Sequence, residues 1–273
     1  MAALIDLALE EDVGGGDRTS EALVPSGTSA RGTLYAKQRL VVCGLPLLHR
    51  VFGALGAVRV TVEAREGTLA EPGAVLATIE GDARALLAGE RLALNLLQHL
   101  SGIATLTRTC VERVRGTRLV VRDTRKTVPG LRLLAKYAVR TGGGSNHRLA
   151  LDDAILIKDN HLVLRGGRVA DAVRAARAAH RGLPLEVECR TLGEVEEAVA
   201  AAPDLILLDN MSLAGLAEAV RLVAGRVPLE ASGGIGPEDL PEVAATGVDY
   251  VAMGVLTHSA PAADLSLKLA PVP

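Results

Sequence analysis

The sequence has few aromatic residues, no long apolar run and no marked excess of charge of one sign. It contains no Trp, one Phe and three Tyr among 273 residues. Proteins that bind single-stranded nucleic acid stack the bases on aromatic side chains, so this scarcity excludes that mode of binding. No apolar run approaches the roughly 18 to 20 residues that span a bilayer. The net charge of -2 gives no general attraction to nucleic acid or to anionic membranes.

Cysteine is also scarce, with Cys43, Cys110 and Cys189 alone in the chain. The count is odd and no two of them form a C-x-x-C pair, which argues against a disulfide framework and against a zinc site. The chain starts M-A-A-L-I-D-L, with an early acid and no basic segment, which is not the pattern of a signal peptide. We therefore expect a protein of the reducing cytoplasm.

The pattern of apolar residues divides the chain into two parts. Between residues 30 and 79, short alternating segments separated by turn signals are typical of antiparallel strands with a helix or two, an α+β unit. Residues 83–114 have a helical pattern that we expect to break at Gly102. Beyond them, helical segments alternate with short apolar strand candidates at 119–123, 154–158, 185–189, 205–209, 228–232 and 248–253. This alternation predicts parallel βα units and favours a βα barrel, with an open doubly wound sheet as the alternative.

Each of these strand candidates ends in a polar residue or a bare glycine. In a βα barrel the carboxyl ends of the strands meet at one rim, where catalytic groups gather. The residues at these ends are Asp123, Lys158, Glu188, Asp209, Ser232 and the pair Met253-Gly254. Their shared position predicts an active site at this rim.

The residues predicted at the rim divide into two chemistries. Positive side chains are concentrated between residues 123 and 161, namely Arg125, Lys126, His147, Arg148 and Lys158. Buried charge is costly unless it is paired, so this density predicts a pocket for one or more anions, which arginine and lysine bind well. Glu188 and Asp209 would face it and hold Mg²⁺ or sugar hydroxyls. A substrate that needs both sets carries phosphate, carboxylate and ribose.

Two plainer interpretations compete with a ligand site. Arg125 and Arg148 would pair with Asp123 and with Asp152 or Asp153, and Glu188 and Asp209 would pair with the cations. The glycines of Ser232-Gly233-Gly234 and Met253-Gly254-Val255 favour a phosphate site, because backbone N–H groups approach a ligand closely there.

Five long motifs occur in order along the chain: E-R-L-A-L-N-L-L-Q-H-L-S-G-I-A-T, D-T-R-K-T-V-P-G-L-R, K-Y-A-V-R-T-G-G-G-S-N-H-R, I-L-I-K-D-N-H and A-S-G-G-I. Together they resemble the carboxylating nicotinate-nucleotide pyrophosphorylases, or quinolinate phosphoribosyltransferases, of NAD biosynthesis. The resemblance implies an α+β sandwich domain at residues 1–104, to which a tail at 258–273 returns. It also implies a βα barrel with fewer than eight strands at 105–257, and a homodimer whose active site is shared between subunits.

The resemblance also implies a role for each rim residue. Quinolinate would be bound by Arg91 from the neighbouring subunit with Thr124, Arg125, His147, Arg148 and Lys158. Phosphoribosyl pyrophosphate (PRPP) would be bound by Lys126, Glu188, Asp209, Ser232, Gly233, Gly234, Met253, Gly254 and Val255. Mg²⁺ would be held by Glu188 and Asp209, and catalysis would depend on Lys126, Lys158, Glu188 and Asp209. The family often has a smaller residue than Met253 at that position.

Three other functions remain as alternatives. One is a pyrophosphorylase-like protein of molybdenum transport with the same fold, which lacks the full set of cationic motifs. The second is a Schiff-base aldolase that uses Lys158, since lysines on barrel strands carry out such chemistry. The third is a sugar-phosphate sensor that binds its ligand without releasing pyrophosphate.

Overall fold

The computed structural model describes residues 2–272, which form two compact units. The first unit comprises residues up to Leu106, with Arg140–Gly143 and the segment from Ala260 onward. The second comprises Thr107–Val139 and Gly144–Ser259. Among residues 2–272, no helix combines the length and the apolarity needed to cross a bilayer.

The first unit is built on a four-stranded antiparallel sheet in the order β12-β1-β5-β3. Its elements are α1 (Ala2–Val13), α2 (Arg18–Leu23), β1 (Ser29–Ala36), β2 (Leu40–Val41), α3 (Pro46–Leu55), β3 (Val58–Val62), β4 (Leu69–Ala70), β5 (Val75–Asp82), the first part of α4 (Ala83–Arg113) and β12 (Leu265–Pro271). The last strand pairs with the first, with Leu34 opposite Leu267. Phe52, Leu86 and Leu97 are buried in the core of this unit.

The expected break at Gly102 is wrong, because α4 is continuous over 31 residues. Glycine is required at position 102 for another reason. A Cβ at this position would overlap the carbonyl oxygen of Pro261 and approach the Cα of Ala262 to 3.2 Å. Glycine is thus needed for the close approach of two segments and not as a helix breaker.

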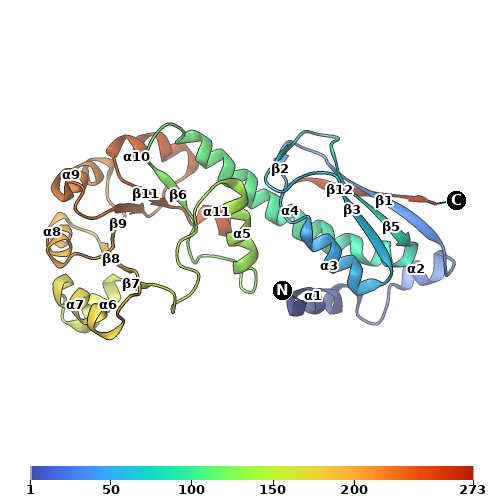
Figure 1. The fold of residues 1–273 in the computed structure, drawn as a ribbon, viewed down its shortest axis with the longest axis horizontal. Helices are drawn as coiled ribbons and strands as arrows, with labels where there is room; N and C mark the ends of the chain where they lie inside the picture. Colours follow the sequence, from blue (N-terminus) through green and yellow to red (C-terminus); the bar gives the residue numbers. More distant parts are fainter. Residues whose placement is uncertain (1, 273) are drawn as a thin grey trace. The chain divides into compact units, whose positions relative to one another are not determined.

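The second unit contains a six-stranded parallel sheet in the order β6-β11-β10-β9-β8-β7, with helices α7 to α10 along its outer side (Figure 1). Its elements are β6 (Val120–Arg122), α5 (Arg132–Gly142), β7 (Ile155–Ile157), α6 (Asp159–Arg165), α7 (Val169–Ala179), β8 (Leu185–Cys189), α8 (Leu192–Ala201), β9 (Leu205–Asp209), α9 (Leu213–Val223), β10 (Leu229–Ser232), the 3-10 turn Pro237–Asp239, α10 (Leu240–Thr246), β11 (Tyr250–Ala252) and α11 (Val255–His258). All six strands lie within the six predicted segments, which confirms those predictions.

The strand order is that of a barrel rather than of a doubly wound sheet. Strands β7 to β11 are neighbours in chain order, and the first strand, β6, lies beside the last, β11. Within residues 2–272 no ladder joins β6 to β7, so the six-stranded barrel is open on that side. Ser145 takes the place of a strand there: its N–H donates to Val121 at 2.8 Å, and its carbonyl accepts from Asp123 N at 3.1 Å.

Local sequence signals account for the helices of this unit. Thr191 begins α8 as an N-cap and accepts a hydrogen bond from Glu194 N at 3.2 Å, while the Glu194 side chain returns to the cap. Ser212 caps α9 in the same way, through Gly215 N at 3.2 Å. Such caps satisfy backbone donors that have no partner within the helix. They place each helix start directly after a strand end, which leaves the strand ends free to form a site.

We predict that Gly102→Ala lowers the stability of the protein although alanine is the better helix former by about 1 kcal/mol. The added methyl group meets the Pro261 carbonyl, and such overpacking costs about 1 to 3 kcal/mol. The matched control is Gly53→Ala in α3, where nothing lies within 4 Å of the added carbon. Urea denaturation should give a lower free energy of unfolding for the first variant and an equal or higher one for the second. Equal gains in both would contradict the close approach.

Candidate active site

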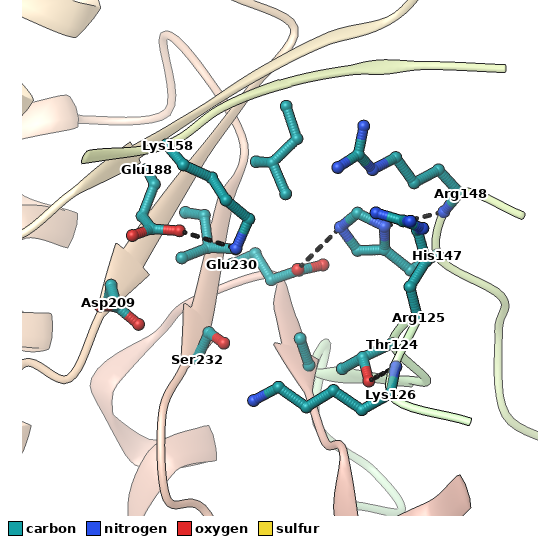
Figure 2. Close-up of a pocket in the computed structure, with 13 residues that line it drawn as sticks. Thr124, Arg125, Lys126, His147, Arg148, Lys158, Glu188, Asp209, Glu230 and Ser232 are labelled. Carbon is teal, nitrogen blue, oxygen red and sulfur yellow. Dashed lines mark hydrogen bonds and ion pairs between the residues drawn. The ribbon is translucent and has the colours of Figure 1, made fainter. Parts of the chain in front are cut away.

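A cavity of about 320 Å³ opens at the carboxyl ends of the barrel strands. Many of the predicted site residues line it, namely Thr124, Arg125, Lys126, His147, Arg148, Lys158, Glu188, Asp209 and Ser232. Figure 2 shows Arg125, His147 and Arg148 on one side and Glu188 and Asp209 on the other. The structure therefore brings the two predicted chemistries to opposite walls of one cavity.

The remaining predicted residues do not line this cavity. Gly233 and Gly234 follow β10 with positive φ angles and border a neighbouring depression. Met253 is buried, and a Cβ on Gly254 would lie 3.0 Å from Cδ of Lys126. The latter contact brings this turn close to the cavity wall. Val255 begins α11, and Arg91 is an exposed residue of α4 in the first unit.

The two arginines on the positive wall have no carboxylate partner. Within residues 2–272 neither Arg125 nor Arg148 forms an ion pair, and the Nε atom of each is buried without a hydrogen-bond partner. Arg148 donates through Nη1 to the carbonyl of Ala154 at 3.0 Å. Burial lowers the pKa of its guanidinium, and the nearby charge of Arg125 adds to that effect. Unpaired, partly buried cations of this kind fit an anionic ligand, and the competing interpretation of pairing with Asp123, Asp152 or Asp153 is not found.

Asp123 instead has a structural role beneath this wall. Its carboxylate is fully buried and accepts from Lys136 Nζ, from Asn146 Nδ2 and, at 2.8 Å, from His147 N. Lys136 also donates to the His147 carbonyl at 2.8 Å. These bonds hold the S-N-H-R segment against β6. The sequence-based prediction did not include Lys136 or Asn146. Asn146 could have been found, because it lies beside His147 within the motif K-Y-A-V-R-T-G-G-G-S-N-H-R.

The opposite wall carries carboxylates that are already near cations. Lys158 Nζ lies 3.3 Å from Glu188 Oε2. Arg190, which was not predicted, lies between the acids: its guanidinium is 2.8 Å from Asp159, 3.3 Å from Asp209 and 3.8 Å from Glu188. A positive group thus already occupies the space between Glu188 and Asp209. Their oxygen atoms suit a hard cation such as Mg²⁺, so the residues present fit that metal.

Lys126 lies at the mouth of the cavity on a backbone that is fixed at two points. Its N–H donates to Thr124 Oγ1 at 3.0 Å, and its carbonyl accepts from Thr257 Oγ1 at 2.7 Å. Within residues 2–272 its ammonium group has no ion pair or hydrogen bond. A fixed backbone with a free ammonium is the arrangement expected for binding a mobile anion.

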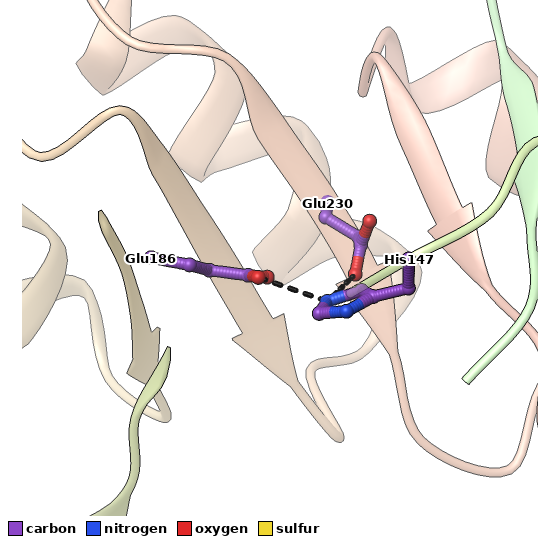
Figure 3. A group of neighbouring side chains, drawn as sticks. All are labelled: His147, Glu186 and Glu230. Carbon is purple, nitrogen blue, oxygen red and sulfur yellow. Dashed lines mark ion pairs between the residues drawn. The ribbon is translucent and has the colours of Figure 1, made fainter. Parts of the chain in front are cut away.

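In the wall of the cavity, His147 contacts two buried glutamates, one of which, Glu230, also lines the cavity (Figure 3). Its Nε2 lies 2.9 Å from Glu186 Oε2 and 3.5 Å from Glu230 Oε1, and Glu230 also pairs with Arg122 Nη1 at 2.7 Å. The three side chains of His147, Glu186 and Glu230 are of the types that bind metals and lie close together. Sequence reasoning missed Arg122 and Glu186. Glu186 precedes Glu188 by two residues on a strand, so both side chains point to the same face, and this period of two was the available signal.

Comparisons with known proteins agree on the family. The sequence matches the families described as "Quinolinate phosphoribosyl transferase, N-terminal domain" over residues 17–101 and "Quinolinate phosphoribosyl transferase, C-terminal domain" over residues 103–268. A nicotinate-nucleotide pyrophosphorylase [carboxylating] from Mycobacterium leprae is 47% identical over 270 residues, which cover 96% of this chain and 94% of the relative. The Homo sapiens protein of that name is 42% identical, with 100% of this chain and 94% of the relative covered.

Solved structures are similar over the whole chain. The crystal structure of NadC from Streptococcus pyogenes has a TM-score of 0.95 and 42% identity, and the match covers 99% of this chain and 96% of that one. A nicotinate-nucleotide pyrophosphorylase from Ehrlichia chaffeensis has a TM-score of 0.95 and 37% identity, with 99% and 98% covered. These matches, together with the barrel and its cationic rim, identify an enzyme of the phosphoribosyltransferase class. The chain belongs to the quinolinate phosphoribosyltransferase family.

We predict that Glu230 makes stability depend on pH. Burial raises the pKa of its carboxyl from the ordinary 4.5 to about 7, and the nearby charge of Glu186 adds to the shift. The folded state then binds the proton more tightly than the unfolded state, so this contribution to stability is full below pH 4.5 and is lost as the pH rises toward 7. Glu230→Gln should remove that loss. Chemical denaturation between pH 5 and 8 should show the variant gaining relative to wild type as the pH rises, and parallel profiles would contradict the assignment.

Proposed function

We propose that this chain is a carboxylating nicotinate-nucleotide pyrophosphorylase. It transfers the phosphoribosyl group of PRPP to quinolinate and releases pyrophosphate and CO₂, which gives nicotinate mononucleotide for NAD biosynthesis. The observation that carries the proposal is the segregation of unpaired cations and of carboxylates on opposite walls of one cavity. The printed names of relatives that match the whole chain support the same reaction.

The positive wall would bind quinolinate. This substrate is a dianion, and Arg125 and Arg148 on this wall, with Lys158 on the opposite wall, offer charges for its two carboxylates at the cavity surface. The sugar donor brings further negative charge, and two like unit charges 4 Å apart near a protein surface repel by about 4 kcal/mol. The free ammonium of Lys126 would offset the charge of the diphosphate. Together these cations allow the two anions to approach with the ring nitrogen directed at the anomeric carbon.

The carboxylate wall would hold the ribose and the metal. Glu188 and Asp209 line the cavity and would accept hydrogen bonds from the ribose hydroxyls and hold Mg²⁺. When bound, Mg²⁺ stabilises the charge of the departing pyrophosphate. The turn at Ser232-Gly233-Gly234, with Met253-Gly254-Val255, would present backbone N–H groups to the 5-phosphate. No covalent bond to the protein is needed.

Decarboxylation would follow from the charge of the product ring. Once the ring nitrogen is bonded to ribose it is quaternary, and its positive charge stabilises the electron pair that stays on the adjacent ring carbon as CO₂ departs. A proton from solvent then takes the place of the carboxylate on that carbon. The protein has to keep that carboxylate in place until then. Arg125 and Arg148 have no other anionic partner within residues 2–272 and would serve this purpose.

The surroundings of Lys158 do not favour the Schiff-base alternative. A lysine that forms a Schiff base is activated by an apolar pocket or by neighbouring cations. The Lys158 side chain is about half exposed and pairs with Glu188, so it does not lie in an apolar pocket. A transferase therefore accounts better for this residue.

We predict that the protein with quinolinate, PRPP and Mg²⁺ releases CO₂ and pyrophosphate in equal amounts. Carboxyl-labelled quinolinate measures the first product, and a coupled pyrophosphate assay measures the second. Nicotinate is the matched control substrate because it lacks the departing carboxylate and should give no CO₂. If quinolinate gives neither product, the proposed reaction is wrong.

We further propose a homodimer in which Arg91 of the partner subunit completes each quinolinate site. Arg91→Ala and Lys126→Ala should each abolish turnover. In a hybrid dimer one site carries both changes and the other carries none. A mixture in which half of the dimers are hybrid should regain about a quarter of wild-type activity. Differently tagged chains measure hybrid formation, and hybrids without activity would show that Arg91 acts within its own chain.

A further inference from the structure

The hydrogen bonds of His147 determine which ring nitrogen carries the proton. Its Nδ1 lies 2.8 Å from the backbone nitrogen of Arg148. A backbone N–H is always a donor, so Nδ1 accepts and carries no proton. The proton is then on Nε2, which donates to Glu186 Oε2 at 2.9 Å. With both nitrogens in use, the imidazole is a neutral link between two parts of the protein rather than a free cation in the cavity.

Glu186 has no other partner in the part of the chain that the structure describes. It is 7% exposed, and its second carboxylate oxygen is buried without a hydrogen bond. A buried carboxylate destabilises the folded state unless it is well paired. If packing of the core were all that mattered, a leucine at this strand position would give the more stable protein. The hydrogen bond that it accepts from His147 is therefore its main contribution to the structure.

The contact continues from His147 to Arg148. The His147 ring holds the backbone of Arg148 through Nδ1, and the Ala154 carbonyl holds the far end of the side chain at 3.0 Å. The Nε atom between these two points has no partner, and the side chain lines the cavity. If the ring turned, the backbone end would be released and the guanidinium would lose its fixed direction.

We propose that Glu186 is a positioning residue for the substrate dicarboxylate. Its oxygen accepts from the His147 Nε2–H and fixes the orientation of the ring, and so keeps Arg148 directed into the cavity. The inference rests on the proposed function for its kinetic consequence, while the tautomer itself is independent of any activity. Glu186 touches no substrate in this scheme; it acts through its contact with His147, and its charge also acts on the guanidinium of Arg148.

Glu230 differs from Glu186 although the two carboxylates lie side by side. Its contact with the His147 ring is longer, at 3.5 Å, and its other oxygen pairs with Arg122 at 2.7 Å. Arg122 in turn stacks over Tyr250, with its guanidinium carbon 4.9 Å from the ring centre. Glu230 therefore ties β10 to β6, whereas Glu186 ties β8 to the loop that carries His147.

The kinetic test compares Glu186→Ala with Glu186→Gln. Alanine removes the acceptor, and we expect the KM for quinolinate to rise tenfold or more while the KM for PRPP changes by less than about twofold. Glutamine keeps an acceptor oxygen at the same reach and should restore most of the quinolinate affinity. In a His147→Ala background, Glu186→Ala should add less than about twofold, because its effect passes through the imidazole. An unchanged KM for quinolinate, equal losses for both substrates, or additive effects in the double variant would overturn the proposal.

A second measurement needs no activity. The ¹⁵N shifts of the histidine rings report the tautomer, and the signal that disappears in His147→Ala identifies this ring. We expect a hydrogen-bonded Nε2–H in wild type and in Glu186→Gln, and a changed Nε2 shift in Glu186→Ala, where that hydrogen bond is lost. A wild-type ring that is protonated at Nδ1, or an unchanged spectrum in Glu186→Ala, would refute the inference. A protein with the expected tautomer but no quinolinate turnover would refute the proposed function and leave this positioning contact established.

Discussion

The carboxylate of Asp123 is the contact on which the geometry of the site depends. It lies at the end of β6 without solvent exposure and is stabilised by an ammonium, an amide and a backbone N–H. A buried carboxylate accepts such bonds strongly and is costly to leave unpaired, so the segment that supplies them is firmly held. That segment ends in His147 and Arg148. The positive wall of the cavity is therefore built on a negative charge that no substrate reaches.

The sequence was sufficient to predict the architecture and most of the rim. The alternation of apolar strands with helices located all six barrel strands, and the polar residues at their ends led to Lys158, Glu188, Asp209 and Ser232. These predictions succeeded because strand ends of a parallel barrel converge for topological reasons alone. Whether the phosphate-binding turns and Arg91 act as the resemblance implies stays a prediction, because they do not line the cavity of this unit.

What the sequence did not reveal depends on contacts between distant segments. Glu186, Lys136 and Arg122 are charged residues within apolar segments, and their partners come from other strands and loops. Gly102 resembled a helix break because its true cause, the carbonyl of Pro261, is far away in the chain. Arg190 follows β8 by one residue and gave no periodic signal, yet it contacts acids from three segments. Local patterns cannot anticipate which tertiary neighbour a residue meets.

The open side of the barrel has a mechanical consequence. Ser145 is bonded to Val121 and Asp123 as a strand residue would be, although only a single bridge forms there. The loop that follows begins from a residue hydrogen-bonded to the sheet, and Asn146 and His147, which lead to Arg148, are bonded to Asp123. The open side of the barrel is thus the place where the loop is anchored. The connection between α5 and β7 is rich in glycine, and this anchor determines where its last cation, Arg148, enters the cavity.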